Sequence, residues 1–463
     1  MKRKEFLQSI IGASAFLGLP FKTLGAENNS IQDLINNTKR DTDGSMFGFT
    51  TDKINKIRVG IIGLGNRGNT LLEMFQYLVE KNHAEIIALS DITEKKVRLA
   101  SEKLSIWQKK KATIYHKNNN EWKKLCKRDD IDLIIIATPW NLHATMALYS
   151  MENGKHVGCE VPIATNIEDC WKIIETSERT KKHCMMMENC NYNEEELWVL
   201  NMIQEGVFGD ITHTEGAYLH DLRALMLDDT YYENQWRLLE HTKRNGNLYT
   251  THGLGPISFY LNIGRGDTFS HLSSMSSREL NLSNAAKQIN HPIQSYKCGD
   301  MNNTMIKTKK GKTILLQFDV HTGRPYSRIN KLVGTKAVHD GYPSRLYIEG
   351  EEPTYWGHNW LKKEEYNKYR SKYQHPIMKK LKVISSEFKQ GHGGMDFIMI
   401  YRIIRCLNLG LPLDINVYDS VMWSSITPLS ELSVAANSQS IIIPDFTAGI
   451  WEKENPLEIM KEV

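Results

Sequence analysis

Six residues, Gly-Leu-Gly-Asn-Arg-Gly at positions 63–68, impose the strongest constraint on the fold of this chain. They follow a short apolar run at residues 57–62, of the kind that is buried in a parallel sheet. After them, apolar residues recur at helical spacing from residue 69 to residue 80. A strand, a glycine turn and a helix in this order let the backbone approach a pyrophosphate at the helix N-terminus. The motif alone is a weak signal, but in this context it predicts a dinucleotide site.

The alternation of strand and helix continues along the chain. Apolar runs of strand type alternate with segments of helical periodicity, with strands at residues 86–90, 131–137, 156–160 and 183–187 and helices at residues 94–104, 145–153 and 167–180. Strands that alternate with helices favour a doubly wound parallel sheet. We therefore predict an N-terminal α/β domain of the Rossmann type over residues 54–189.

The character of the sequence changes after the last of these strands. A helix at residues 194–205 and a strand at residues 212–219 are followed by long polar connections rich in Tyr, His, Arg and Asn. Helical periodicity returns at residues 396–409 and 417–436, and we expect these helices to pack back on the first domain. A chain of 463 residues also exceeds one comfortable core. Residues 190–463 are therefore predicted to form an α+β substrate domain on a mostly antiparallel sheet.

The N-terminus has the features of an export signal. A basic start precedes an apolar stretch and the small pair Gly25-Ala26, so we expect residues 1–26 to be removed near Ala26. The opening Arg3-Lys4 resembles a twin-arginine signal with lysine in place of the second arginine, and a general secretory signal remains open. Residues 27–53 are polar without sustained periodicity and are predicted to be a linker or N-terminal arm. The protein is thus expected to be exported to the periplasm.

Charge and hydropathy exclude several classes of partner. Of the formal net charge of +4, the expected signal supplies +3, from four basic residues less one acidic residue. The rest of the chain lacks the clustered Lys and Arg residues that are typical of a nucleic-acid-binding domain. Beyond the signal, no run of about 20 apolar residues suggests a membrane span.

The cysteines give no metal or disulfide pattern. Seven are scattered without zinc-type spacing, and an odd number cannot all pair, so we predict no metal site. Cys190 is either a nucleophile or, like the others, a small buried hydrophobe.

A carboxylate after the second strand selects the dinucleotide. Asp91 stands where an acidic residue accepts hydrogen bonds from the adenosine ribose and repels a 2′-phosphate, which favours NAD over NADP. The alternative is that Asp91 only caps the helix after Thr93. Two further strand ends, residues 137–143 and 159–162, lie where ligands bind in open α/β sheets. Trp140 in the first of them is either a wall of the cofactor site or a loop-packing aromatic.

These residues resemble the glucose-fructose oxidoreductase and inositol dehydrogenase superfamily, in which a Rossmann domain precedes a substrate sheet. Two departures point to a particular branch. The superfamily has a lysine in its Glu-Lys-Pro turn, whereas here Val161 stands between Glu160 and Pro162, and its later Asp-x-Gly-x-His signature is replaced by Thr-His-Gly-Leu-Gly at residues 251–255. The chain is similar instead to family 109 glycoside hydrolases. The similarity covers nearly the whole chain, with long polar and aromatic strings at residues 187–192, 217–223, 236–237, 244–249, 251–256, 323–327 and 392–397.

The resemblance implies two sets of site residues. Those expected to bind NAD are Gly63, Gly65, Asn66, Arg67, Gly68, Asp91, Trp140, Asn141, Leu142, His143, Glu160, Val161 and Asn189. Those expected to meet the sugar are Tyr192, Arg237, Tyr249, Thr250, Thr251, His252 and Tyr326. Among them, His252, Tyr249, Tyr192 and Tyr326 are the catalytic candidates, and each has a purely structural alternative.

The resemblance also implies a reaction. Members of the family cleave terminal α-linked N-acetylgalactosamine without the usual pair of carboxylates, as NAD-dependent glycosidases do. The cycle comprises transient oxidation at C3, loss of the C2 proton, elimination, addition of water and re-reduction, and a tightly bound NAD is recycled. His252 is the candidate base for the C3 hydroxyl because imidazole titrates near neutrality. The three tyrosines are candidates for proton relay and for protonation of the leaving group, and Arg237 would either lower their pKa or hold the developing enolate oxygen.

Two other functions fit the same motifs. A stoichiometric NAD-dependent sugar dehydrogenase would accumulate NADH, and a non-catalytic nucleotide-binding sensor would turn over nothing. Several assignments stay open, among them the sugar, the C2 base, the leaving-group acid and a homodimer. Asp221 and Arg223 are interpreted as a structural pair, and residues 392–394 as either a substrate-facing loop or a flexible turn.

Overall fold

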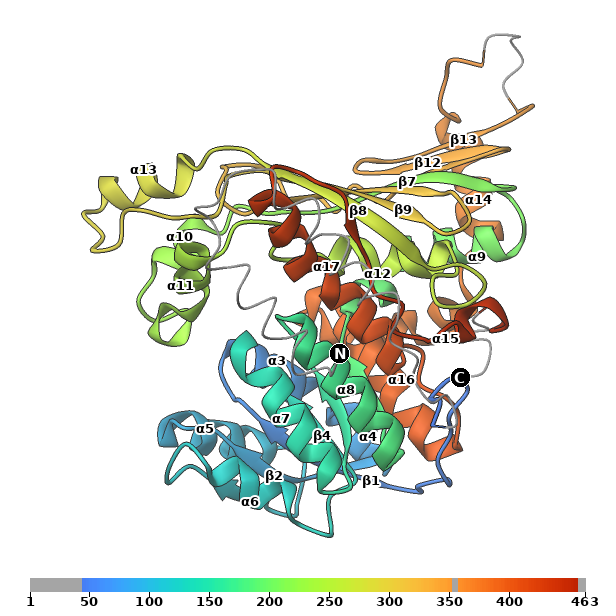
Figure 1. Cartoon of the computed structure of the whole chain (residues 1–463). Coiled ribbons are helices and arrows are strands. Elements are labelled where there is room, and N and C mark those ends of the chain that lie inside the picture. Colours follow the sequence, from blue (N-terminus) through green and yellow to red (C-terminus); the bar gives the residue numbers. More distant parts are fainter. Residues whose placement is uncertain (1–43, 352–356, 457–463) are drawn as a thin grey trace.

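The computed structural model describes residues 44–351 and 357–456, which form two sheets with helices between and around them (Figure 1). The expected export signal, residues 1–26, and most of the expected N-terminal arm lie outside the described residues. From residue 44 the arm packs on the molecule, where Phe47 stacks on Tyr418 with 4.4 Å between ring centroids.

The first sheet is parallel and has six strands in the order β3-β2-β1-β4-β5-β6. Its strands are β1 (Ile57–Ile62), β2 (Ala84–Ser90), β3 (Thr113–Tyr115), β4 (Leu133–Ile136), β5 (His156–Cys159) and β6 (Cys184–Met186). The helices around it are α3 (Asn66–Met74), α4 (Gln76–Glu80), α5 (Glu94–Leu104), α6 (Glu121–Cys126), α7 (Trp140–Glu152) and α8 (Ile167–Thr180). The central strands are buried on both faces, as expected for apolar runs in a doubly wound sheet. The predicted Rossmann fold is confirmed.

Several local boundaries differ from the predictions. The predicted helix 69–80 begins earlier and is divided at Phe75 into α3 and α4. Helix α7 begins at Trp140 instead of 145, directly after Pro139, which is suited to a helix start. Strand β3 and helix α6 were not predicted, because each is short and β3 is only partly buried, which leaves little periodicity to detect.

The second sheet is mixed but mostly antiparallel, and its eight strands run in the order β13-β12-β11-β7-β10-β9-β8-β14. Its strands are β7 (Ile211–Leu219), β8 (Phe269–Ser276), β9 (Asn302–Thr308), β10 (Thr313–Asp319), β11 (Lys331–Gly334), β12 (Ala337–Gly341), β13 (Ser344–Ile348) and β14 (Ile441–Ile442). Strands β7 and β10 are the parallel pair, and every other pairing in the sheet is antiparallel. The predicted α+β domain is thereby confirmed.

The remaining α-helices surround this sheet and connect it to the first. They are α9 (Glu194–Gln204), α10 (Arg223–Leu227), α11 (Trp236–Lys243), α12 (Thr251–Tyr260), α13 (Asn281–Gln288), α14 (Lys363–Lys372), α15 (Pro376–Ser385), α16 (Met395–Leu409) and α17 (Val417–Ala435). In Figure 1, α12 and α17 lie beneath the inner face of the second sheet, and α16 lies beside the first. Ser420 on α17 accepts a hydrogen bond from the Met186 amide at 2.8 Å, and Ser424 one from the Ile163 amide at 3.2 Å. The C-terminal helices therefore bind the two sheets together.

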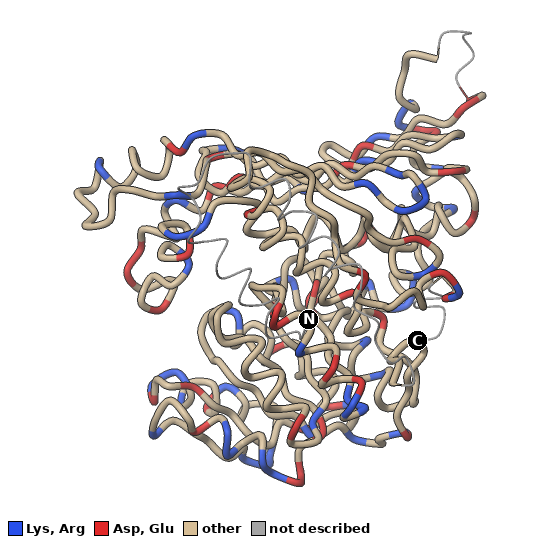
Figure 2. Tube along the Cα trace, viewed as in Figure 1, with Lys and Arg blue, Asp and Glu red and all other residues tan. Residues whose placement is uncertain are grey.

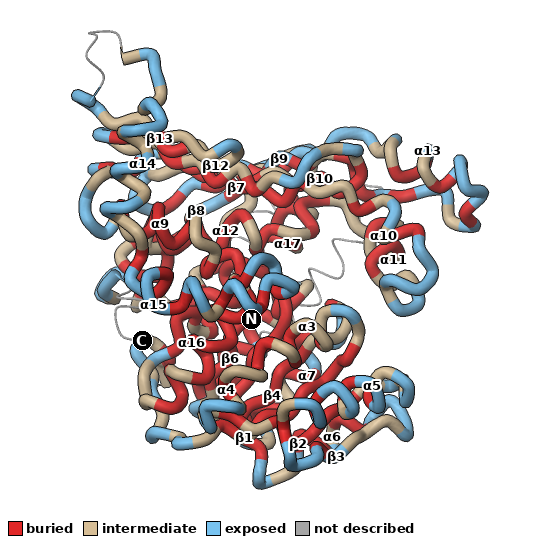
Figure 3. Tube along the Cα trace, turned by 180° about the vertical axis from the view of Figure 1, so that it is seen from behind, coloured by how far each residue is buried: buried red, intermediate tan, exposed pale blue. Residues whose placement is uncertain are grey.

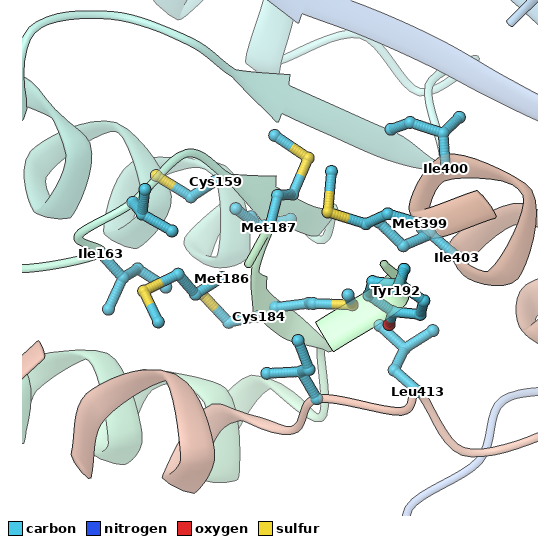
Figure 4. Close-up of a cluster of buried hydrophobic side chains, with 14 of the residues drawn as sticks. Cys159, Ile163, Cys184, Met186, Met187, Tyr192, Met399, Ile400, Ile403 and Leu413 are labelled. Atoms are coloured by element: carbon cyan, nitrogen blue, oxygen red, sulfur yellow. The ribbon is translucent and has the colours of Figure 1, made fainter. Parts of the chain in front are cut away.

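Most of the buried apolar residues form one continuous core that spans both domains (Figure 3). Figure 4 shows part of it, where Met187 at the end of the first sheet lies beside Met399 of α16, and Met186 points to the other side, toward Ile163. A smaller cluster lies under α10, α11 and α13 and includes Leu222, Leu238 and Leu282.

The described surface carries charges of both signs. Basic and acidic residues are interspersed along both domains (Figure 2). Among the described helices, none combines the length and apolarity that a membrane crossing requires.

Candidate active site

A cavity of about 830 Å³ lies between the carboxyl edge of the parallel sheet and the second domain. From the first domain it is lined by Gly63, Gly65, Asn66, Arg67, Asp91, Trp140, Asn141, Leu142, His143, Glu160, Val161 and Asn189. From the second it is lined by Tyr218, His220, Tyr231, Tyr232, Trp236, Arg237, Tyr249, His252 and His392, among others. The edge formed by the carboxyl ends of the strands is where open α/β sheets bind their ligands.

Each of the three glycines in the turn is needed for a different reason. Gly63 has a φ of +89°, and a Cβ there would lie 2.6 Å from the Ala137 carbonyl oxygen. A Cβ at Gly68 would lie 1.9 Å from the Gly63 carbonyl oxygen, so only glycine lets helix α3 pack this closely. A Cβ at Gly65 would meet no protein atom within 4 Å, because that position faces the cavity. The space above Gly65 is what a pyrophosphate needs to approach the backbone.

Asp91 lines the same cavity and also holds the turn. One of its carboxylate oxygens accepts from the Leu64 amide at 2.7 Å, and the other accepts from the Thr93 amide at 2.8 Å. Asp91 thus does not cap α5, as the structural alternative supposed, but accepts from the amide of Thr93, the N-cap residue of that helix, beside its position at the cavity. A carboxylate has further lone pairs, which remain for ribose hydroxyls.

Arg67 connects the glycine turn to two other parts of the chain. Its Nε donates to Glu160 at 2.7 Å, and its Nη2 donates to Asp396 at 2.9 Å. Asp396 also accepts from the Asn189 amide group at 2.7 Å. Burial opposes ionisation of Asp396, but Arg67 and His392 outweigh it and hold the pKa of this carboxyl far below its usual range.

The residues from Trp140 to His143 form the first turn of α7. Trp140 contacts Trp236 with 5.1 Å between ring centroids and Tyr249 with 5.9 Å, so it is a wall between the two halves of the cavity. His143 lines the cavity, but its ring nitrogens lie 2.7 Å from the carbonyl oxygens of Pro162 and Thr138. This imidazole is therefore fixed, and burial lowers its pKa.

Arg237 is buried among aromatic rings. Its guanidinium carbon lies 5.2 Å from the ring centroid of Trp140, 5.5 Å from that of Tyr232 and 4.9 Å from that of Tyr249. Nη1 donates to the Tyr232 hydroxyl at 3.2 Å, whereas Nε and Nη2 have no hydrogen-bond partner among the described residues. A buried cation with unused donors is suited to hold an oxygen that gains negative charge.

His252 stands in the first turn of α12, opposite a buried carboxylate. Its Nδ1 lies 2.7 Å and 2.9 Å from the two carboxylate oxygens of Glu188. Tyr249 and Tyr218 meet the imidazole edge-on, with ring centroids 4.8 Å and 5.3 Å away. Burial opposes ionisation of Glu188, but the contact with His252 outweighs it and lowers the pKa of this carboxyl. The cavity thus contains both the glycine turn and a histidine that is hydrogen-bonded to a buried carboxylate.

Comparison with known proteins decides the family. A model described as "Glycosyl hydrolase 109, C-terminal domain" matches residues 192–453, and one described as "Oxidoreductase family, NAD-binding Rossmann fold" matches residues 57–188. The chain belongs to glycosyl hydrolase family 109. A protein of Shewanella oneidensis named alpha-N-acetylgalactosaminidase is 42% identical over 463 residues, which cover 99% of this chain and 98% of that protein. A family 109 protein of Shewanella sp. strain W3-18-1 is 43% identical over 465 residues, with the same coverage of 99% and 98%.

Solved structures with the same fold are more distant in sequence. An oxidoreductase domain protein of Kribbella flavida has a TM-score of 0.64 at 17% identity and covers 85% of this chain and 100% of its own. A levoglucosan dehydrogenase in complex with NADH and L-sorbose has a TM-score of 0.62 at 18% identity and covers 84% and 100%. At these identities the likeness shows the fold alone.

Several residues expected at the sugar site of this family 109 chain lie elsewhere. Tyr192 is fully buried in the core, and its hydroxyl donates to Asp414 at 3.3 Å, so we correct its assignment as a catalytic residue (Figure 4). Thr250 and Thr251 are buried beneath the cavity, where the Thr250 hydroxyl donates to the Trp423 carbonyl at 2.9 Å. They support the start of α12 and do not line the cavity.

Tyr326 lies at the border of the cavity, neither in its lining nor in the core. It does not line the cavity, but its ring meets His220, which does, with 5.1 Å between centroids. Arg328 donates to its hydroxyl at 3.1 Å. Tyr326 therefore borders the site from outside.

Sequence reasoning missed Tyr218, His220, Trp236 and Glu188 as site residues. All four belong to strings on which the family resemblance rests, at residues 187–192, 217–223 and 236–237, and this was the available signal. In the structure the Tyr218 hydroxyl lies 3.1 Å from Nδ1 of His220. Burial raises the pKa of Tyr218 to about 12, against the effect of Arg237.

Two alternatives left open by the sequence are resolved. His392 lines the cavity with about half of its side chain exposed, and its Nδ1 lies 2.8 Å from Asp396, so this loop faces the cavity. Asp221 and Arg223 form the expected pair, at 2.8 Å.

The seven cysteines and the pair of His241 and His321 do not line the cavity. All seven cysteines are free and buried, and burial raises the pKa of Cys190 well above its usual value, which disfavours a nucleophile. His241, Cys298 and His321 have atoms of metal-ligating type within 4.8 Å of one another. The two imidazoles already lie 2.8 Å apart, however, a hydrogen-bonding distance that leaves no room for an ion between them.

Proposed function

We propose that this chain is a glycosidase that releases terminal α-linked N-acetylgalactosamine and uses NAD without consuming it. The observation that carries the proposal is that one cavity contains both the glycine turn and the pair of His252 and Arg237. A relative that matches the chain over its full length bears the name of this activity.

The residues at the turn fit a dinucleotide. Gly65 leaves open space at the N-terminus of α3, and Asp91 borders the same space where an NAD ribose is recognised. When bound, NAD supplies a reversible acceptor for the hydride of the sugar. Asn66 and the first turn of α7 complete the walls of that half of the cavity.

His252 and Arg237 are assigned to the oxidised carbon. His252 takes the proton of the C3 hydroxyl through the ring nitrogen that Glu188 does not occupy. The two unused donors of Arg237 hold the C3 oxygen, which stabilises the enolate formed when the C2 proton leaves.

Tyr249 and His392 are assigned to proton donation. Burial raises the pKa of Tyr249 well above its usual value, so its hydroxyl keeps its proton at neutral pH and acts as a donor. His392 is half exposed at the mouth of the cavity, where a leaving glycan would depart. We assign protonation of the leaving oxygen to His392, which is oriented by Asp396.

Retention of NAD is attributed to a strap, residues 228–236, that crosses from the second domain to the first. Asn66 donates to the Tyr231 carbonyl at 3.4 Å, and Lys96 of α5 pairs with Glu233. Trp236 packs against Trp140. A dinucleotide beneath the strap would leave only when these contacts open, as recycling requires.

A panel of chromogenic α- and β-glycosides in deuterated water tests the proposal. Release of the aryl group from the α-N-acetylgalactosaminide, with deuterium at C2 of the product and no build-up of NADH, is expected. A stoichiometric dehydrogenase would instead form NADH without releasing the aryl group. A sensor would do neither.

We also propose export to the periplasm and a homodimer. The apolar N-terminal stretch between basic and small residues supports export, and a tightly held NAD suits a compartment poor in free dinucleotide.

The outward face of the second sheet exposes Met275 and Met305 at 63% and 44%, and these apolar side chains support pairing of two copies of the chain on this face. Fractionation of cells and sedimentation velocity of the mature chain test the two proposals.

A further inference from the structure

A buried carboxylate lies directly behind His252, within the string at residues 187–192, and the resemblance gave it no role in the site. Glu188 follows the last strand of the parallel sheet and begins the short helix η1 (Asn189–Tyr192). Its side chain is 0% exposed, and one of its oxygens accepts from the Cys190 amide at 3.0 Å. The amide of its own loop therefore holds this carboxylate in place before any substrate binds.

The carboxylate reaches His252 because a glycine stands one turn further along α12. A Cβ at Gly255 would lie 2.8 Å from Cγ of Glu188 and 2.4 Å from the side-chain oxygen of Asn191. Any larger residue would push Glu188 away from the imidazole. Helix α12 and the loop that carries Glu188 thus lie close enough together for Glu188 to contact His252.

The hydrogen bonds decide which nitrogen of the ring is available. Both carboxylate oxygens lie within 2.9 Å of Nδ1, and an ionised carboxylate only accepts, so the Nδ1 proton stays there. No hydrogen bond engages Nε2 among the described residues, and His252 lines the cavity. A neutral imidazole with its proton on Nδ1 has the Nε2 lone pair free to accept one.

The other groups around the ring do not compete for this role. Tyr218 and Tyr249 face it edge-on, and both have raised pKa values, so they are neutral near pH 7. The Cys190 thiol near Glu188 is also neutral, because burial raises its pKa. His220 and Arg237 are the other basic groups on this side, and neither hydrogen-bonds to the imidazole among the described contacts. Glu188 is the one carboxylate that touches it in the described part of the chain.

We propose that Glu188 is the positioning residue of the reaction: it fixes the tautomer of His252 and supports the positive charge that forms when Nε2 takes the sugar's C3 proton. This assignment rests on the proposed function. Glu188 itself neither gains nor loses a proton in the step. The C3 hydroxyl proton moves to Nε2, and NAD, when bound, would accept the C3 hydrogen as a hydride. The arrangement is one in which a buried acid orients a catalytic imidazole.

Glu188→Gln tests the assignment, with Glu178→Gln as the matched control. Glu178 is also a buried carboxylate and accepts from the Tyr418 hydroxyl, but it lies on α8 outside the cavity. We expect Glu188→Gln to lower kcat about 10²- to 10⁴-fold, to change KM less than about threefold and to leave bound NAD in place. The ring ¹⁵N NMR signals of His252 should show the proton on Nδ1 in the wild type and lose this preference in the variant, because the Gln amide can donate as well as accept. Glu188→Asp should recover part of the rate.

A purely structural Glu188 would give a different set of results. The melting temperature and NAD content would fall together with kcat, as for a folding defect, and the tautomer of His252 would be the same as in the wild type; this outcome overturns the assignment. If no glycoside is turned over at all, the proposed function fails, and histidine NMR still tests the dyad. The ring ¹⁵N signals of His252, assigned with His252→Gln, should show the proton fixed on Nδ1 in the wild type but not in Glu188→Gln, and an unchanged tautomer rejects the inference.

Discussion

The guanidinium of Arg237 lies over the ring of Tyr249, 4.9 Å from its centroid, with two of its nitrogens free of any described partner. Stacking on aromatic rings lets a buried arginine keep its charge while its donors remain available. Because Tyr249 also contacts His252, this stacking places the Arg237 guanidinium close to that histidine in the same cavity. The first prediction depends on this arrangement.

Replacement of Arg237 by methionine should reduce kcat/KM on an aryl α-N-acetylgalactosaminide about 10²- to 10³-fold, the usual effect of removing one group that stabilises a developing oxyanion. Arg223→Met, which breaks only the pair with Asp221 outside the cavity, is the control and should stay within about threefold. Steady-state kinetics measure both variants. Equal losses in the two would contradict the role of Arg237.

Gly65→Ala and Gly68→Ala should separate cofactor binding from folding. The new methyl group at position 65 meets no protein atom but enters the cavity, so we expect a normal melting temperature and little bound NAD. At position 68 the methyl group meets the Gly63 carbonyl, and the variant should lose about 1–3 kcal/mol of stability or more. Thermal melting and the absorbance of extracted dinucleotide distinguish the two. A Gly65→Ala protein that still contains full NAD would refute the placement.

Asp396→Asn should destabilise the protein at neutral pH and less so in acid. The pKa of Asp396 is depressed in the folded state by Arg67 and His392, which outweigh burial. Its contribution to stability is therefore complete above the ordinary carboxyl value of about 3.9 and falls as the pH drops below it. Urea unfolding should show a difference of about 3 kcal/mol between wild type and variant at pH 7. The difference should narrow below about pH 4, and a constant difference across this range would exclude the ionised pair.

Trp236→Ala should open the strap. Loss of the contact with Trp140 removes one of its links to the first domain, so NAD should dissociate at least about tenfold faster while the fold stays intact. Exchange against labelled NAD measures the rate. Ile289→Ala, an exposed apolar residue outside the cavity, controls for general loosening. Unchanged exchange in Trp236→Ala would mean that the strap does not retain the cofactor.

The fold was largely predictable because its apolar pattern is regular. Strand β1 and helices α5 and α8 match the predicted ranges, since each pairs a buried apolar face with clear turn residues. The family resemblance then supplied the residues on the first-domain side of the cavity.

The substrate side was harder to predict. Tyr192 and Tyr218 are both tyrosines within strings typical of the family, yet one packs in the core and the other lines the cavity. The packing of the two sheets decides which face of β7 lies toward the dinucleotide site. No short stretch of the sequence determines that packing. The contact between Glu188 and His252 joins residues 64 positions apart and follows only from the assembled fold.

The ion pair between Arg67 and Asp396 spans 329 positions of the chain. During synthesis the glycine turn leaves the ribosome long before the helix that carries its counter-charge. The nucleotide pocket can therefore form completely only when translation is nearly over. A dinucleotide that binds in the cytoplasm would have to enter the pocket after translation of that helix and before any transport.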